Sequence, residues 1–238
     1  MAGQAGRAGA AGAAGAAGAA GEDRRRRRHL RAVARLAARL PRARRRAWFV
    51  PGRRVAVADR MQRGYSYVLA APAGRAFAPG FRPGVTPARM LRMGVFEGRY
   101  LNDCTGELPR EWFEGALRAG RLRPGGADPA ANHFGVKSRL SLREWRRRGW
   151  VPAAPGDRDV RGWFQWYCRY WLGRRQPAVD AVQVARWRAF ARHAAQVRAS
   201  YARLRAAGRP PPRTRAEKRA HRPRQRQALL QWAYSPYL

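Results

Sequence analysis

The chain has 238 residues, of which 51 are lysine or arginine and 14 are aspartate or glutamate, so the formal net charge is +37. This length fits one domain with tails or two small domains. The two cysteines, Cys104 and Cys168, provide neither a disulfide framework nor four soft metal ligands, and no run of 18 apolar residues would cross a membrane. Because Met1 and the residues after it open no apolar segment, we also expect no secretory signal. These features predict a cytoplasmic or nuclear protein in a reducing compartment.

The excess of positive charge has two interpretations. Only Lys137 and Lys218 are lysine, so the abundant arginine, alanine, glycine and proline are typical of a compositional bias in the genome. Replacing lysine by arginine leaves the charge unchanged, however, so such replacement alone does not produce the excess of positive charge. Self-repulsion on this scale destabilises a compact fold unless counterions or an anionic partner neutralise it. The composition therefore favours a polyanionic partner such as nucleic acid.

The charge is concentrated at the two ends of the chain. Residues 1–50 carry 13 arginines and two acids, and residues 201–238 carry ten basic residues and one acid. Residues 101–150 hold ten basic and six acidic residues. We therefore expect two basic arms around a more balanced middle.

The N-terminal segment is of low complexity. Residues 8–21 read AGAAGAAGAAGAAG, without the prolines of collagen, which predicts a flexible tail. Five arginines at 24–28 precede a short basic amphipathic pattern that ends at Pro41, with apolar residues at helical spacing: Leu30, Val33, Leu36 and Leu40. Such a segment suits a nucleic-acid or import arm, a targeting or membrane-surface helix, or a solvated disordered tail.

The remaining sequence predicts a single, mainly α domain over 48–238, after a disordered basic tail over 1–47. A minor β or extended element is expected from two short runs, Val55–Val57 and Tyr65–Leu69. Helices are then predicted to begin after Thr86, Pro109, Ser141 and Asp159 and to end at Gly94, Gly120, Gly149 and Gly173.

The helix predicted over 160–172 is apolar around most of its circumference. Its polar residues Arg161, Gln165 and Arg169 recur every four positions and so form one narrow stripe. A helix of this kind belongs in the core, with the stripe facing a cleft or an acidic neighbour.

The longest predicted helix, over 178–206, is amphipathic. Arginines occupy one side, and apolar residues follow the other side at 3.6-residue spacing: Val179, Trp187, Phe190, Ala194, Val197, Tyr201 and Leu204. Three prolines at 210–212 break the chain, a basic segment follows, and Pro223 opens a last helix that is expected to dock on the core.

Five blocks of the chain carry a resemblance to a known family. They are GYSYVL at 64–69, GVFEGRYLNDC at 94–104, FGVK at 134–137, GWFQWYCRYWLGRR at 162–175 and RQRQALLQWAY at 224–234. In these blocks and their order the chain resembles a family of uncharacterised proteins found in bacteria and some eukaryotes. The resemblance spans about 52–235, leaves out the basic N-terminal tail, and implies one domain without assigning it an activity or a cofactor.

Residues for catalysis are present, although not at a diagnostic spacing. Asp103, Cys104 and Glu107 lie in LNDCTGE; Cys104 with His133 would make a nucleophile and base, and Asp103, Glu107 and Asp157 would make a nuclease-like Mg²⁺ site. Asp159 is a further candidate acid. These acids equally serve as helix caps and partners of arginine, and no Cys/His set or glycine-rich loop indicates zinc or a nucleotide cofactor. We therefore predict no metal and no cofactor.

A composite arginine surface is the strongest candidate for a functional site. Guanidinium groups bind phosphates bidentately, and no signature of a base-reading domain occurs. We therefore expect non-enzymatic, sequence-indifferent binding of nucleic acid or another polyanion. An enzyme acting on such a substrate and a protein assembly factor remain as alternatives. The predicted binding residues are Arg174, Arg175, Arg188, Arg192, Arg203, Arg213, Arg215, Arg219, Arg222, Arg224 and Arg226.

Overall fold

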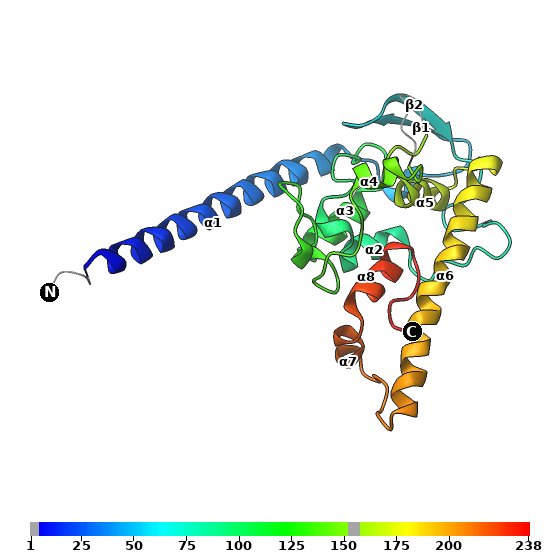
Figure 1. The fold of residues 1–238 in the computed structure, drawn as a ribbon. Helices are drawn as coiled ribbons and strands as arrows, with labels where there is room; N and C mark the ends of the chain where they lie inside the picture. Colours follow the sequence, from blue (N-terminus) through cyan, green and yellow to red (C-terminus); the bar gives the residue numbers. More distant parts are fainter. Residues whose placement is uncertain (1–4, 152–157) are drawn as a thin grey trace.

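The computed structural model describes residues 5–151 and 158–238, with side chains from Ala20 onward. It shows a mainly α fold with one two-stranded antiparallel sheet (Figure 1), which confirms the predicted class. The described residues include no helix that could span a lipid bilayer. In chain order, the helices and strands are α1 (Ala5–Arg39), β1 (Arg54–Ala58), β2 (Arg63–Val68), α2 (Pro87–Met93), α3 (Arg110–Arg118), α4 (Leu142–Arg147), α5 (Trp163–Leu172), α6 (Pro177–Ala206), α7 (Arg215–Ala220) and α8 (Pro223–Gln231).

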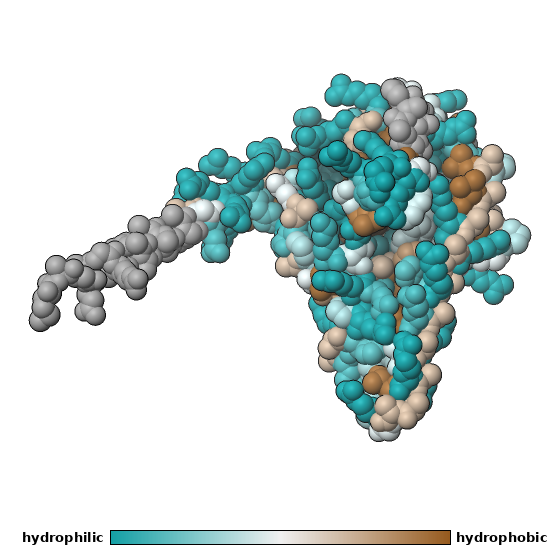
Figure 2. Space-filling model, viewed as in Figure 1, coloured by the Kyte–Doolittle hydropathy of each residue, from teal (hydrophilic) through white to brown (hydrophobic). Residues whose placement is uncertain are grey.

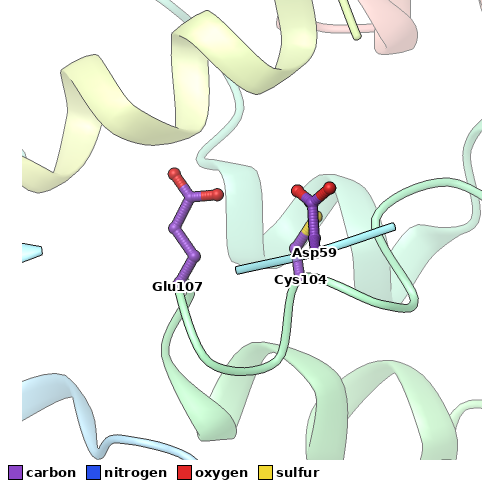
Figure 3. A group of neighbouring side chains, drawn as sticks. All are labelled: Asp59, Cys104 and Glu107. Atoms are coloured by element: carbon purple, nitrogen blue, oxygen red, sulfur yellow. The ribbon is translucent and has the colours of Figure 1, made fainter. Parts of the chain in front are cut away.

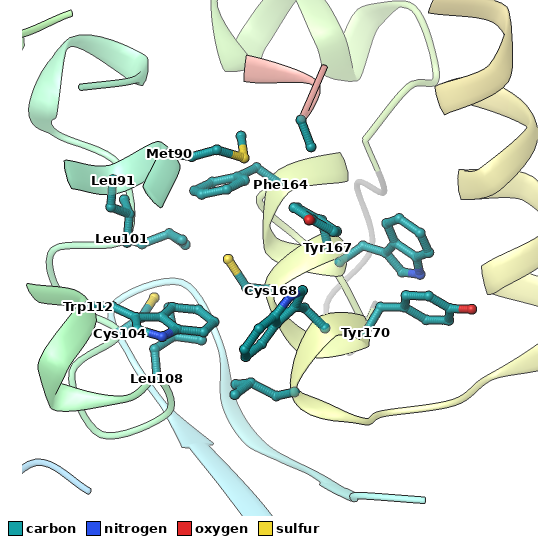
Figure 4. Close-up of a cluster of buried hydrophobic side chains, with 14 of the residues drawn as sticks. Met90, Leu91, Leu101, Cys104, Leu108, Trp112, Phe164, Tyr167, Cys168 and Tyr170 are labelled. Atoms are coloured by element: carbon teal, nitrogen blue, oxygen red, sulfur yellow. The ribbon is translucent and has the colours of Figure 1, made fainter. Parts of the chain in front are cut away.

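Helix α5 forms the centre of the core, as its all-round apolar pattern predicts. All ten of its residues are buried. Figure 4 shows Phe164 and Cys168 of α5 facing residues of α2, α3 and the 101–108 segment. Trp166 stacks on Tyr170 within the helix, with ring centroids 4.9 Å apart. Burial of large aromatic rings is the main source of stabilisation in such a core.

Of the four helix starts predicted from local signals, those after Thr86, Pro109 and Ser141 are confirmed and the one after Asp159 is wrong. Thr86 Oγ1 accepts a hydrogen bond from the N–H of Arg89, and Ser141 Oγ accepts one from the N–H of Glu144. Asp159 does not cap α5, which begins at Trp163 after Gly162. The Asp159 carboxylate instead accepts hydrogen bonds from Arg169 and Arg174, and it accepts none from the first N–H groups of α5.

The small sheet covers one end of the core. Strand β1 pairs with β2 in the register Val55↔Tyr67 and Val57↔Tyr65, with an irregularity after Val57. Alternate residues of β1 are buried, so Val55 and Val57 contact the core while their neighbours face solvent.

Part of the segment assigned to the tail belongs to the domain. Helix α1 leaves the body of the molecule toward the N-terminus (Figure 1), but Ala32 and Leu36 near its other end are 7% and 3% exposed, and Leu40 just after it is 5% exposed. The predicted boundary at Trp48 therefore comes too late, because one face of the last turns of α1 packs on the core. The part of the tail prediction that concerns residues 1–4 lies outside the described residues.

The C-terminal third forms a helical extension. Figure 1 shows α6 running away from the core, with α7 and α8 returning beside it. Phe190 of α6 stacks on Trp232 at 4.7 Å, and Trp187 stacks on Tyr234 at 4.7 Å, so the last helix docks as expected. Helix α7 was not predicted, although Thr214 and Glu217 form the capping box at its start.

Candidate functional site

A buried network of arginines and carboxylates lies between α5, the 101–108 segment and the turn after β1. Arg169 is fully buried; its guanidinium donates to both carboxylate oxygens of Glu107 and, at 3.0 Å, to Asp159. Arg174 binds both oxygens of Asp159, at 2.9 and 2.7 Å. We call this set the buried ionic network; it consists of Arg161, Arg169, Arg174, Asp59, Asp103, Glu107 and Asp159.

The polar stripe of α5 accounts for part of this network. Arg161 precedes α5 by two residues and donates from Nη2 to Asp59 at 2.9 Å and to Asp103 at 2.8 Å. Arg169 lies two turns farther along the same side. The prediction that this stripe faces an acidic neighbour is therefore confirmed, because it meets four carboxylates, three of them distant in sequence and the fourth, Asp159, ten residues before Arg169. Charges buried in this way are tolerated only when they are paired and hydrogen-bonded.

Asp59, Cys104 and Glu107 lie close enough together to be candidate ligands of one metal ion (Figure 3). Their possible ligand atoms all lie within 4.8 Å of one another. Burial acts to raise the pKa of Asp59, but hydrogen bonds from the Met61 N–H and from Arg161 hold this pKa below its usual value. Burial also raises the pKa of the Cys104 thiol, so it stays protonated at neutral pH. A protonated thiol and two carboxylates already neutralised by guanidinium groups make a poor cation site.

The catalytic pairs considered from the sequence are not assembled among the described residues. His133 Nε2 lies 2.6 Å from the Tyr237 hydroxyl, near the C-terminus, whereas the Cys104 thiol lies 3.4 Å from Asp59. Asp103, Glu107 and Asp159 each bind an arginine, and Asp157 lies outside the described residues. The nearby acids therefore stabilise buried arginines.

Two of the predicted anion-binding arginines lie inside the protein, which corrects their assignment to the surface. Arg174 is 1% exposed in the buried ionic network, and Arg226 is fully buried. Arg226 donates to the carbonyls of His221 and Pro236 and to the Tyr201 hydroxyl, and so ties α8 to the C-terminus and α6.

The other predicted residues differ in exposure. Arg175 is half-buried and donates to four backbone carbonyls, and Arg222 is also half-buried. Seven of the predicted arginines are exposed: Arg188, Arg192, Arg203, Arg213, Arg215, Arg219 and Arg224.

The charge of the C-terminal part is not neutralised internally. Residues 175–238 contain 15 basic side chains and two acids. Among the described residues, all twelve salt bridges join groups at or before Arg174. The two acids serve helix starts: Asp180 accepts from the N–H of Gln176 and the indole of Trp166, and Glu217 accepts from the N–H groups of Arg213 and Thr214. The exposed arginines of α6 and α7 consequently have no carboxylate partner in this part of the chain.

Basic residues also connect α7 to α1 across the surface. Burial, then the charges of Arg219 and Arg121, lower the pKa of His133 to about 4. Burial, then the charge of Arg123, lowers the pKa of His29 on α1. These interactions place Arg219, the 121–123 loop and α1 next to one another in that order. We call this set the α1–α7 basic surface; it consists of Arg25, Arg26, Arg28, His29, Arg121, Arg123, Arg215 and Arg219.

A groove lies within this basic surface. It has a volume of about 640 Å³ and separates the arginines of α1 from the loop at 123–129. Hydrophilic side chains cover most of the face drawn in Figure 2, including the described part of α1. Sequence reasoning missed Arg121 and Arg123, because the 101–150 region is less basic than the two ends of the chain; the position of these arginines beside α1 arises only from folding.

The comparisons with known proteins provide no relative: no family model, no curated protein and no solved structure matches the chain.

Proposed function

We propose that this protein binds a polyanion, in the first place nucleic acid, through contacts between exposed arginines and phosphates, without a catalytic step. The observation that carries the proposal is the absence of any salt bridge among the described residues from 175 to 238, where 15 basic side chains face two acids. The α1–α7 basic surface continues the positive charge from α7 to α1. A cytoplasmic or nuclear location belongs to the same proposal.

The physical basis is the release of counterions. Each phosphate that an arginine neutralises frees a condensed cation, and this entropy gain does not depend on the base sequence. Guanidinium groups also match phosphate oxygens in a bidentate geometry. Single-stranded nucleic acid is a suitable form, because it lets the backbone follow an irregular basic surface.

The structure gives less support to an assembly factor held by exposed aromatics. All nine tryptophans lie within the described residues, and among them only Trp150 is exposed. The other large apolar side chains that are exposed among the described residues are scattered through the sequence: Leu30, Val50, Met61, Val68, Leu140 and Val182. Isolated apolar residues of this kind are common on protein surfaces.

The proposal is tested with fluorescently labelled 20-nucleotide strands that carry 5′-hydroxyl ends. Affinities for unrelated DNA and RNA sequences are expected to agree within about tenfold, because phosphate contacts carry no sequence information. Heparin, a polyanion without bases, is expected to displace the strand. Failure to bind any of these strands at 50 mM salt would contradict the proposal, and a strong preference for one sequence would contradict sequence-indifferent binding.

Histidine titration provides a second test, specific to the α1–α7 basic surface. The pKa of His133 is about 4, against the usual 6.5, so the neutral ring stabilises the fold fully above pH 6.5 and this contribution is lost as the pH falls toward 4. A bound phosphate beside Arg219 and Arg121 offsets their charges, so we expect the pKa of His133 to rise on binding. By linkage, binding should strengthen as the pH falls through this range.

The measurement is a pH titration of the four histidine ring signals by NMR, with and without a bound strand. Arg219→Gln should raise the pKa of His133 in the free protein, whereas Arg192→Gln on α6 should not. An unchanged pKa of His133 at saturation would place the ligand elsewhere.

A further inference from the structure

A pocket lies on a different part of α1 and shares no residue with the α1–α7 basic surface. Its volume is about 490 Å³, within the range of roughly 300–1,000 Å³ for small-molecule sites. It is lined by the last turns of α1, the turn after β1 and the segment from 99 to 103, and it is open to solvent on one side. The charged residues of its wall are Arg35, Arg39, Arg60, Arg99, Arg161 and Asp103.

Arg161 is the preorganised binding group of this pocket. Its side chain is 9% exposed, and its Nη2 is fixed by Asp59 and Asp103. Among the described residues, its Nη1 has no hydrogen-bond partner, and its Nε is buried and unpaired. Leaving a charged donor of a buried side chain without an acceptor costs free energy. A ligand that supplies an acceptor to the Arg161 guanidinium would therefore be stabilised by it. Its fixed position means that binding would cost little side-chain entropy.

The charges of the wall favour a ligand with more than one negative charge. Five guanidinium groups face one carboxylate, and that carboxylate is already occupied, because Asp103 accepts from Arg161 and, at 3.0 Å, from the N–H of Arg60. A phosphate monoester carries close to two negative charges at neutral pH and offers three acceptor oxygens. The volume exceeds that of a lone phosphate, and Met61 and Pro124 add apolar wall for the rest of a ligand.

From this geometry we infer that the pocket binds the phosphate monoester group of a nucleotide-sized ligand, with Arg161 at its floor and the arginines of α1 and of residues 60 and 99 around it. The group is supplied either by a free nucleotide or by the 5′-phosphate end of a strand. This site goes beyond the proposed polyanion binding and does not depend on it, since different residues are involved.

The test is calorimetry with the full chain, using adenosine 5′-monophosphate, adenosine and inorganic phosphate as probes. The monophosphate is expected to bind, adenosine to bind at least roughly tenfold more weakly, and inorganic phosphate to compete, because charge-assisted hydrogen bonds carry the affinity. A strand with a 5′-phosphate that binds no better than its 5′-hydroxyl counterpart, while the monophosphate binds, would identify the free nucleotide as the source. Equal binding of adenosine and its monophosphate would overturn the inference.

Substitutions distinguish monophosphate binding in this pocket from nonspecific attraction of an anion to a basic protein. The Arg60 and Arg99 side chains are exposed and form no salt bridge among the described residues, so the double variant Arg60→Gln, Arg99→Gln should fold. Its affinity for the monophosphate should be roughly tenfold lower. Asp103→Asn should strengthen monophosphate binding, because the substitution removes the negative charge that opposes the ligand and keeps an acceptor oxygen. The matched control, Arg213→Gln with Arg219→Gln, should leave it unchanged. An equal reduction in the control and the pocket variant would overturn the inference, and 5′-hydroxyl strands test the proposed function separately.

Discussion

Replacing Arg169 by methionine is expected to lower the free energy of unfolding by about 3–5 kcal/mol, the usual cost of removing one partner of a buried ion pair. The Arg169 side chain is 0% exposed and binds Glu107, Asp159 and Gln62. Without it, the one hydrogen bond that the Glu107 carboxylate keeps among the described residues is from the hydroxyl of Tyr67, at 3.2 Å. Since small domains are stable by about 5–15 kcal/mol in total, this destabilisation is large.

The effect is measured by urea unfolding monitored with circular dichroism, and two further variants serve as a control and as a rescue. Arg192→Met, the same substitution on the exposed face of α6, should change the stability by less than about 0.5 kcal/mol. Adding Glu107→Gln to Arg169→Met should restore part of the stability, because the remaining buried charge is removed. A double variant no more stable than Arg169→Met would contradict the structural role of this pair.

The affinity for single-stranded or duplex nucleic acid is expected to fall roughly a thousandfold between 50 and 200 mM salt, if about six phosphates are neutralised. The seven exposed arginines predicted from the sequence are enough to neutralise this number of phosphates without any contribution from the buried Arg174 and Arg226. The measurement is fluorescence anisotropy at several salt concentrations, plotted as the logarithm of affinity against the logarithm of salt. A flat response would show that charge does not drive binding.

Local signals in the sequence predicted most of the helices. Thr86, Ser141 and Pro223 mark helix starts that the structure confirms, because caps and first-turn prolines act within a few residues. The aromatic pattern of α5 also predicted its central position, since a helix that is apolar on nearly all sides has no solvent face. The short α7 was missed, although its Thr214–Glu217 capping box is present in the sequence.

The sequence did not show which arginines are buried, because burial depends on partners far along the chain. Arg169 meets Glu107, and Arg161 meets Asp59, across 62 and 102 residues. Arg226 is enclosed by backbone carbonyls and Tyr201, for which no local pattern exists. The packing of Leu36 and Leu40 was visible as helical spacing, yet the same spacing fits an isolated amphipathic helix.

The most direct test of polyanion binding by the C-terminal part is the salt dependence of affinity in two matched triple variants. Arg213→Gln, Arg215→Gln and Arg219→Gln remove exposed charges at and just before α7, whereas Arg53→Gln, Arg54→Gln and Arg63→Gln remove the same number at the sheet, at the opposite end of the molecule (Figure 1). The first variant is expected to reduce the slope of log affinity against log salt by roughly one unit for each arginine replaced, about three in all, and the second to leave it unchanged. Equal slopes in the two variants would contradict the claim that unpaired arginines of the C-terminal part hold the polyanion.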